Sequence, residues 1–181
     1  MRTVYLGTSG FAASVLERLA GTPHRPVLVV TRPDRPAGRG RRLTAPPVAG
    51  VAKRLGIDLD QPEDVNGPEA RARIAAAAPD VVVVCAFGAI IKEPLLSDFE
   101  MLNVHPSLLP RWRGAAPVER AIMAGDAETG VCVIDLTAEL DAGPIHGCER
   151  FAIGPEDDAG AVRARARRSA PSTSSRAASV P

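Results

Sequence analysis

No stretch of this sequence approaches the roughly 20 consecutive apolar residues that a membrane-spanning helix needs. The chain also lacks a strong charge of either sign. Its formal net charge is only +1, so charge alone does not indicate a polyanionic partner. Met1 to Val4 lead directly into a strand pattern without a targeting segment. We therefore expect a cytoplasmic protein that does not enter a membrane.

Cysteine is scarce, and the three cysteines stand singly in apolar segments. Their spacing does not match a metal site, and their odd number argues against a full set of disulfides. We therefore predict buried thiols at Cys85, Cys132 and Cys148 in a reducing compartment. The sequence offers neither a metal-ligand set nor a covalent nucleophile.

The 181 residues, 45% of them hydrophobic, are enough to bury one core. Short apolar runs alternate with Ala-rich amphipathic runs, which is typical of an α/β fold with a mostly parallel sheet flanked by helices. The run from Val81 to Val84 is β-branched on both faces, as in a strand covered on both sides. The last two expected strands look antiparallel. The expected strands are Thr3–Gly7, Val27–Thr31, Val81–Ala86, Leu102–His105, Gly130–Asp135 and Pro144–Phe151, and the expected helices are Phe11–Ala20, Pro47–Gly56, Pro68–Ala78, Lys92–Phe99 and Ala115–Ala124.

The most informative segment reads Asn-Val-His-Pro-Ser-Leu-Leu-Pro-Arg-Trp-Arg-Gly and begins at Asn103. Asn103 and His105 are two residues apart at the end of an apolar run, so in a strand their side chains leave the same face. Both can then point at one substrate oxygen. Asp141, within Leu-Asp-Ala-Gly, would pair with the imidazole. Ligands in open α/β sheets bind at the carboxyl ends of the strands, which favours a site here.

The same residues also have ordinary interpretations. A histidine in a strand is often a hydrogen-bonded core residue, an asparagine at a strand end is often a turn residue, and Leu-Asp-Ala-Gly is a common turn. The prolines at 106 and 110 make the following loop rigid, and its two leucines could form the wall for a flat ligand. Only the whole string favours a catalytic function over these separate structural ones.

That string, with Arg-Gly-Ala-Ala-Pro after it, resembles the signature of the 10-formyltetrahydrofolate-dependent formyltransferases. The similarity in order and spacing runs from Met1 to about Val162. It is greatest to the members that formylate methionyl-initiator tRNA. The resemblance implies a Rossmann-like formyltransferase fold. The blocks that carry the similarity are Val4–Thr8, Thr31–Gly40, Ala86–Ile91, Asn103–Pro110, Arg113–Pro117 and Gly125–Val131.

The resemblance implies roles for particular residues. Asn103 and protonated His105 would donate hydrogen bonds to the oxygen of a tetrahedral intermediate. Asp141 would favour the charged imidazole and help a water move the proton from the attacking amine to the leaving nitrogen. The formyl donor would be 10-formyltetrahydrofolate, with no metal, and we expect a monomer. The residues expected to bind folate are Phe87, Gly88, Ile90, Ser107, Leu108, Leu109 and Pro110.

Five arginines lie within residues 32–42, where prolines and glycines predict an irregular, flexible loop. A run of charges is usually a solvated surface. The resemblance to the loop that enters the acceptor arm of initiator tRNA instead favours phosphate binding. Arg111, Trp112 and Arg113 either add to that surface or pack. The arginines expected to bind tRNA are Arg35, Arg39, Arg41 and Arg42.

Gly7-Thr8-Ser9-Gly10 could form a nucleotide-phosphate loop, but it lacks the full dinucleotide fingerprint and the usual acidic residue further on. We therefore reject an oxidoreductase. The family usually has Pro-Asp where this chain has Ser9-Gly10, beside the expected folate cleft.

The triad alone does not separate related functions. Other family members formylate a glycinamide ribonucleotide or an amino sugar nucleotide, or hydrolyse formyl-folate. The basic loop and Arg113–Pro117 favour tRNA. An inactive, truncated folate-binding fragment is a further alternative.

The last residues differ from the rest of the chain. Residues 163–181 are rich in Arg, Ser and Ala, with almost no large apolar side chain. Such a segment buries too little surface to offset its ordering entropy, so we predict a disordered tail after a catalytic domain of residues 1–162. The C-terminal tRNA-binding domain of the family would be absent, as in a truncated or frameshifted product. The alternative is a basic nucleic-acid arm.

Overall fold

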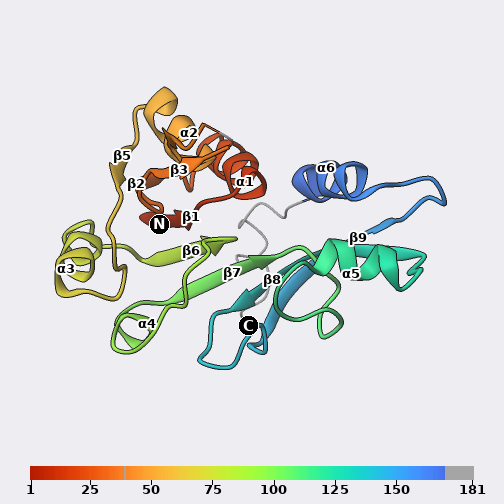
Figure 1. Ribbon diagram of the computed structural model, residues 1–181. Coiled ribbons are helices and arrows are strands. Elements are labelled where there is room, and N and C mark those ends of the chain that lie inside the picture. The colour runs from red at the N-terminus through yellow and green to blue at the C-terminus, as the bar shows by residue number, and fades with distance from the viewer. Residues whose placement is uncertain (39, 170–181) are drawn as a thin grey trace. The chain divides into compact units, whose positions relative to one another are not determined.

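The computed structural model describes residues 1–38 and 40–169 (Figure 1). Within them the chain divides into two compact units, which meet in sequence between Met101 and Leu102. Among these residues, no helix is long and apolar enough to cross a membrane.

The first unit is built on four parallel strands in the order β5-β2-β1-β6. Helices α1 and α2 pack against each other. The strands and helices alternate along the chain, as expected for a parallel α/β fold. The elements are β1 Thr3–Gly7, α1 Gly10–Ala20, β2 Pro26–Val30, β3 Arg35–Ala37, β4 Arg42–Thr44, α2 Pro47–Leu55, β5 Asp58–Asp60, α3 Pro68–Ala76, β6 Val81–Cys85 and α4 Leu95–Asp98.

Local sequence signals explain where these helices begin and end. The Ser9 hydroxyl accepts a hydrogen bond from the Ala12 backbone N–H at 3.2 Å and so caps α1. Helices α2 and α3 begin with Pro47 and Pro68, whose fixed φ suits the first helical position. Gly56 ends α2 in the left-handed conformation. The Ser-Gly pair that departs from the family pattern is therefore a regular helix start.

The core of the first unit lies around β1 and β6. All five residues of each strand are buried, which confirms the interpretation of the valine run. The Tyr5 hydroxyl donates to the Ala12 carbonyl at 2.7 Å, so this polar group is satisfied inside the core. Cys85 is a buried free thiol, and burial raises its pKa to about 12. The prediction of a buried thiol is confirmed at this position.

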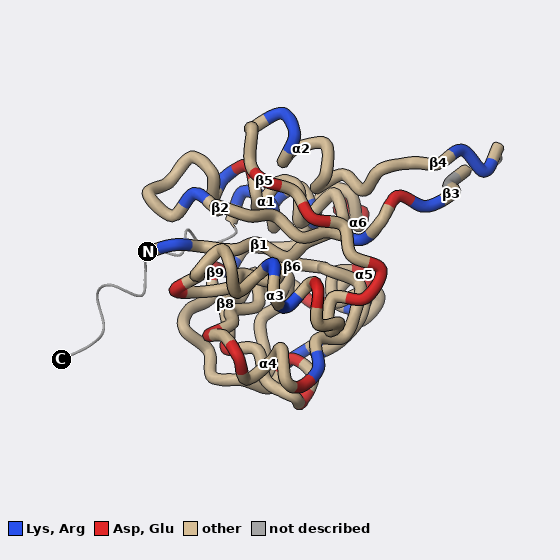
Figure 2. The backbone as a smooth tube through the Cα atoms, turned by 90° about the vertical axis from the view of Figure 1, so that its left-hand side faces the viewer, with Lys and Arg blue, Asp and Glu red and all other residues tan. Residues whose placement is uncertain are grey.

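The basic segment is a hairpin and not the irregular loop that its prolines and glycines predicted. Strands β3 and β4 pair antiparallel, with Arg35 opposite Thr44 and Ala37 opposite Arg42. Gly38 takes a positive φ in the turn, and its carbonyl accepts from the Arg41 N–H at 3.2 Å. Figure 2 shows the hairpin extending away from the helices of its unit, with basic residues at its outer end. Arg39 lies outside the described residues.

The second unit has three antiparallel strands in the order β7-β8-β9. Strand β8 is almost wholly buried, whereas most residues of β9 are exposed. Helix α5 begins with Pro117, again at a first helical position. The elements are β7 Met101–His105, α5 Pro117–Met123, β8 Glu128–Asp135, β9 Ile145–Ala152 and α6 Ala159–Ser169.

The predicted fold class is confirmed: the four strands of the first unit are parallel and alternate with helices, and β8 and β9 are antiparallel. The antiparallel pairing of β7 with β8 was not predicted. The short strands β3, β4 and β5 were also missed, because three residues carry too little periodicity to be recognised. The predicted helix Lys92–Phe99 is only the short α4.

The prediction of single buried thiols is wrong for two of the three cysteines. Cys132 and Cys148 are directly opposed on β8 and β9, their Cα atoms are 4.1 Å apart, and a disulfide joins them. Cys148 is also exposed. Directly opposed residues in an antiparallel pair are close enough for this bond, but single spacings along the sequence do not reveal which residues oppose each other.

The prediction of disorder from Arg163 onward is wrong for residues 163–169, which belong to α6. Val162 and Ala166, four residues apart, are fully buried. Arg165 donates to both Asp157 oxygens at 2.6 Å, and Arg163 pairs with Glu119 of α5. Ion pairs thus support a helix that has only a narrow apolar face. Residues 170–181 of the predicted tail lie outside the described residues.

Candidate active site

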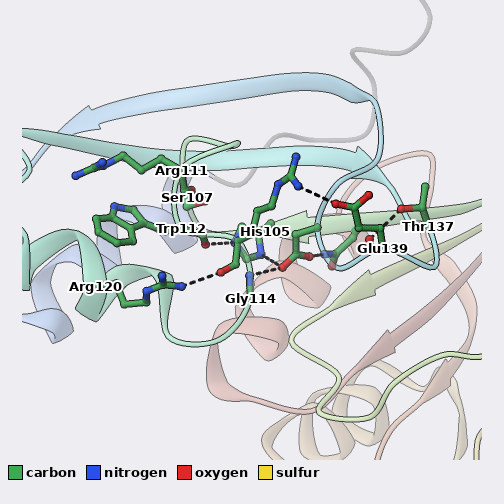
Figure 3. A network of polar contacts seen from close by, with 11 residues as sticks. His105, Ser107, Arg111, Trp112, Gly114, Arg120, Thr137 and Glu139 are labelled. Atoms are coloured by element: carbon green, nitrogen blue, oxygen red, sulfur yellow. Dashed lines mark hydrogen bonds and ion pairs between the residues drawn. The ribbon is translucent and has the colours of Figure 1, made fainter.

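Asn103, His105 and Asp141 come together in the second unit, as the sequence predicted. Figure 3 shows the network of polar contacts around His105. The Asn103 Nδ2 donates to Asp141 Oδ1 at 2.9 Å. The His105 Nδ1 lies 3.4 Å from Asp141 Oδ2. Asn103 and His105 are alternate residues of β7, so their side chains leave the same face and reach one carboxylate.

The loop between β8 and β9 places the carboxylate. Asp141 has a φ of +48°, a left-handed conformation that Asp tolerates better than most residues. Two residues later, a Cβ on Gly143 would lie 2.0 Å from the Asp135 carbonyl oxygen. This loop can therefore pass so close to the end of β8 only because residue 143 is glycine.

Backbone groups complete the polar network. The Gly114 N–H donates to Asp141 Oδ2 at 2.8 Å, and His105 Nε2 lies 3.0 Å from the Trp112 carbonyl oxygen. A carbonyl only accepts hydrogen bonds, so Nε2 carries the proton in that contact. A second proton on Nδ1 would face the carboxylate. Both ring nitrogens therefore face acceptors, so the ring can donate to a substrate oxygen only by sharing the Nε2–H with the Trp112 carbonyl.

The site is shielded from water. The side chains of His105 and Asp141 are each only 7% exposed. Charge interactions are stronger where water is excluded, so a hydrogen-bond donor here stabilises a developing negative charge more than it would at the surface. The arrangement can therefore stabilise the oxyanion of an acyl-transfer intermediate.

The loop after β7 is fixed by its own contacts. Ser107 is fully buried, and its hydroxyl donates to the Arg111 carbonyl at 2.8 Å. Leu108 packs on the backbone of β8, where a Cβ on Gly130 would lie 2.5 Å from its Cδ2. Leu109 is partly buried and Pro110 is exposed. Much of the Leu108 surface expected to contact a ligand is therefore used in packing.

The first unit holds the remaining residues expected to bind folate, in the turn after β6. The Phe87 side chain is only 3% exposed, and its carbonyl accepts from the Thr8 hydroxyl at 2.6 Å. Gly88 is exposed with a φ of +80°. Ile90 is 74% exposed. Gly88 and Ile90 are thus the parts of this segment that a ligand can reach.

The arginines of the β3–β4 hairpin differ in their surroundings. Arg35 forms an ion pair with Glu63, so part of its charge is already compensated. Arg41 and Arg42 are exposed, and the described part of the chain shows no ion pair for either. Among the described arginines of the hairpin, Arg41 and Arg42 are thus more available than Arg35 for contacts outside the chain.

Three features of the site were missed from sequence. The Trp112 carbonyl and the Gly114 N–H are backbone groups, and no side-chain pattern marks them. Asp126 accepts from Arg111 and from the Trp112 indole N–H, at 2.7 to 2.9 Å and 2.6 Å. The only sequence signal for Asp126 was its place in a block shared with the family. Within the described ranges, no cluster of three or more His, Cys, Asp or Glu could hold a metal ion.

Sequence comparisons extend over almost the whole chain. The formyl transferase family model matches residues 1–177. The methionyl-tRNA formyltransferase of Methylococcus capsulatus is 46% identical over 167 residues, which are 91% of this chain and 54% of that protein. The protein of the same name from Aromatoleum aromaticum is 47% identical over 167 residues, 91% of this chain and 53% of that one. The chain spans about half the length of these relatives.

Structural comparisons give the same fold. Phosphoribosylglycinamide formyltransferase from Bacillus halodurans aligns with a TM-score of 0.79 at 22% identity, covering 99% of this chain and 96% of that one. Glycinamide ribonucleotide transformylase 1 from Geobacillus kaustophilus aligns with a TM-score of 0.71 at 26% identity, covering 93% and 92%. The Rossmann-like fold expected from the sequence is therefore confirmed, and with the matching family model and the similar sequences it shows that the chain belongs to the formyl transferase family.

Proposed function

We propose that this chain catalyses formyl transfer from 10-formyltetrahydrofolate to the amino group of methionyl-initiator tRNA. The observation that carries the proposal is the network of Asn103 with the buried His105 and Asp141, in which two side chains from one strand face share a carboxylate. The relatives named methionyl-tRNA formyltransferase support this acceptor, at 46% and 47% identity.

The proposed reaction needs only acid–base and oxyanion chemistry. The methionyl amine attacks the formyl carbon, a C–N bond forms, and the carbonyl electron pair moves to oxygen. Asn103 donates to that oxygen with the Nδ2 hydrogen that does not face Asp141, and His105 donates with its Nε2–H, shared with the Trp112 carbonyl. The intermediate then collapses, the bond to the folate nitrogen breaks, and a water passes the amine proton to the leaving nitrogen. Asp141 holds the charged imidazole throughout.

The substrate contacts are also part of the proposal. In the second unit, residues 107–110 would contact the folate, and in the first unit the exposed Gly88 and Ile90 would do so beside the buried Phe87. Arg41 and Arg42, with Arg35 and Arg39 of the same segment, would contact tRNA phosphates. We propose that the chain acts as a monomer in the cytoplasm and needs no metal.

The direct test is a formylation assay with the 181-residue chain, 10-formyltetrahydrofolate and methionyl-initiator tRNA. A parallel reaction offers glycinamide ribonucleotide, the acceptor suggested by the names of the structural neighbours. We expect transfer to the tRNA at a rate that exceeds transfer to the ribonucleotide. The reverse preference would overturn the proposed acceptor. Folate binding without transfer to either acceptor would support a folate-binding fragment instead.

A further inference from the structure

The residue that anchors the loop beside His105 is Asp126, which lies between α5 and β8. Its carboxylate accepts two hydrogen bonds from Arg111, at 2.9 and 2.7 Å, and one from Trp112 Nε1 at 2.6 Å. Its own N–H donates to the Ala121 carbonyl at 3.0 Å, so the backbone of Asp126 is held at the last turn of α5. Hydrogen bonds from Arg111 and then from Trp112 hold the pKa of Asp126 at about 2, so it stays ionised at neutral pH.

Trp112 is held from several sides. The guanidinium of Arg111 lies 4.3 Å and that of Arg120 4.9 Å from the centre of the indole ring, within cation–π distance. Arg120 also donates to the Arg113 carbonyl at 2.8 Å (Figure 3). The Trp112 backbone has a φ of +63°, a strained conformation for a bulky residue. Such a conformation persists only when its surroundings enforce it.

The strained residue is also the one that contacts the histidine. His105 Nε2 lies 3.0 Å from the Trp112 carbonyl oxygen, while Nδ1 of the same ring faces Asp141 at 3.4 Å. The ring is thus held on one edge by a carboxylate and on the other by a carbonyl. The residue whose side chain Asp126 binds is therefore the one whose carbonyl contacts the His105 ring.

We infer that Asp126 is a positioning residue for His105, acting through the clamped indole and the backbone carbonyl of Trp112. For its kinetic part this inference rests on the proposed formyl transfer. Asp126 would touch neither substrate. It would hold the Nε2 edge of the imidazole in the position from which its N–H is shared with the reacting oxygen, and a misplacement of about 1 Å can reduce a rate by about a hundredfold.

The chain offers a matched control for a variant of Asp126. Asp157 also binds an arginine through both oxygens, at 2.6 Å to Arg165, and hydrogen bonds from Arg165 lower its pKa. Asp157 also lies in the second unit, but its carboxylate accepts hydrogen bonds from Arg165 and from the Gly154 N–H and from no residue of the site. Asp126→Ala and Asp157→Ala therefore remove chemically similar ion pairs. Only Asp126→Ala also removes a hydrogen bond to Trp112, the residue whose carbonyl contacts His105.

The first measurement is independent of activity. In the chain labelled with ¹⁵N-histidine, the His105 Nε2–H signal is assigned with the variant His105→Gln. We expect this proton to exchange slowly in the parent and in Asp157→Ala, and to exchange rapidly in Asp126→Ala. Trp112→Phe keeps an aromatic ring and removes only the indole N–H, so it should have the same effect if Asp126→Ala fails to fold. An unchanged His105 signal in the folded Asp126 or Trp112 variant would overturn the inference.

The second measurement is the single-turnover transfer rate at saturating substrates. We expect Asp126→Ala to lower this rate about ten- to a hundredfold with little change in the KM for folate, and Asp157→Ala to leave it within about twofold. If the transfer rate falls equally in both variants, in proportion to the fraction of unfolded protein, the role of Asp126 is merely structural. If the parent transfers no formyl group, the proposed function fails, and the exchange measurement alone decides the positioning of His105.

Discussion

Cys132 and Cys148 are joined across β8 and β9, and Cys132 is also the register partner of His105 on β7. The crosslink closes a loop with a sequence separation of 16 residues that contains Asp141. A disulfide that closes a loop of this length stabilises a protein by about 3 kcal/mol, mainly by restricting the unfolded chain.

Cys148→Ser should therefore lower the free energy of unfolding by about 2 to 4 kcal/mol, measured by urea denaturation without reductant. The exposed position of Cys148 allows serine without burying its hydroxyl. With dithiothreitol present, the parent should unfold at the same urea concentration as the variant. Equal midpoints for parent and variant under oxidising conditions would show that the crosslink does not form in solution.

The close packing of Leu108 on Gly130 gives a second prediction. A Cβ at Gly130 would lie 2.5 Å from Leu108 Cδ2 and 2.2 Å from the Glu149 carbonyl oxygen, which is backbone and cannot move cheaply. We expect Gly130→Ala to cost about 1 to 3 kcal/mol of stability in thermal or urea unfolding, as other overpacked sites do. Gly147→Ala on the neighbouring strand is the control, since no atom within 4 Å meets its Cβ. A Gly130 variant as stable as the control would contradict the described contact.

The stability of helix α6 should depend on pH because Asp157 pairs with Arg165. Hydrogen bonds from Arg165 and from the Gly154 N–H lower the pKa of this carboxylate in the folded protein. A lowered pKa means that the stabilisation is fully present above the unfolded pKa of about 3.9 and is lost as the pH falls toward the folded value. Amide protection in residues 159–169, corrected for intrinsic exchange rates, should therefore stay constant from pH 7 to about pH 5 and decrease from there toward pH 3. In Asp157→Asn protection should be weaker at pH 7 and change little, whereas equal pH dependence in both proteins would contradict the pairing.

The arginines of the β3–β4 hairpin should strengthen tRNA binding through contacts with phosphates, and these contacts weaken as the salt concentration rises. Replacing Arg41 and Arg42 by Ala should weaken tRNA binding and reduce the slope of log K against log salt by about two, one for each phosphate contact. Folate binding should not change. Arg18→Ala and Arg25→Ala together remove the same charge from the first unit outside the hairpin. If that control reduces the slope equally, the hairpin contributes only general charge.

Patterns that depend on neighbours along the chain could be predicted from sequence. The valine run of β6 follows from β-branched residues on both faces of a strand, the shared face of Asn103 and His105 follows from a period of two, and the structure has both. The opposition of Cys132 and Cys148 could not be predicted, because the register of β8 and β9 contains a shift between Val133 and Ile134. Pairing across strands is set by the whole sheet.

Helix α6 and the Trp112 carbonyl were missed for different reasons. From composition alone, the arginines of α6 look like solvated charges. In the structure Arg163 pairs with Glu119 and Arg165 pairs with Asp157. The buried face of the helix consists of only two small side chains, Val162 and Ala166. The Trp112 carbonyl contacts His105 in a backbone conformation with a positive φ. A tryptophan in the sequence does not indicate that conformation, because bulky residues rarely adopt it.

The most direct test of the central claim compares the single-turnover formyl-transfer rates of the parent, Asn103→Ala and His105→Ala. Each variant should transfer about 10²- to 10³-fold more slowly, the usual loss for one oxyanion donor, with folate affinity changed much less. His146→Ala is the matched control, because that histidine also contacts a carboxylate, Asp135 at 2.6 Å, but lies on β9 outside the network. A near-parental rate in the His105 or Asn103 variant, or an equal loss in the His146 variant, would contradict the assignment of this site.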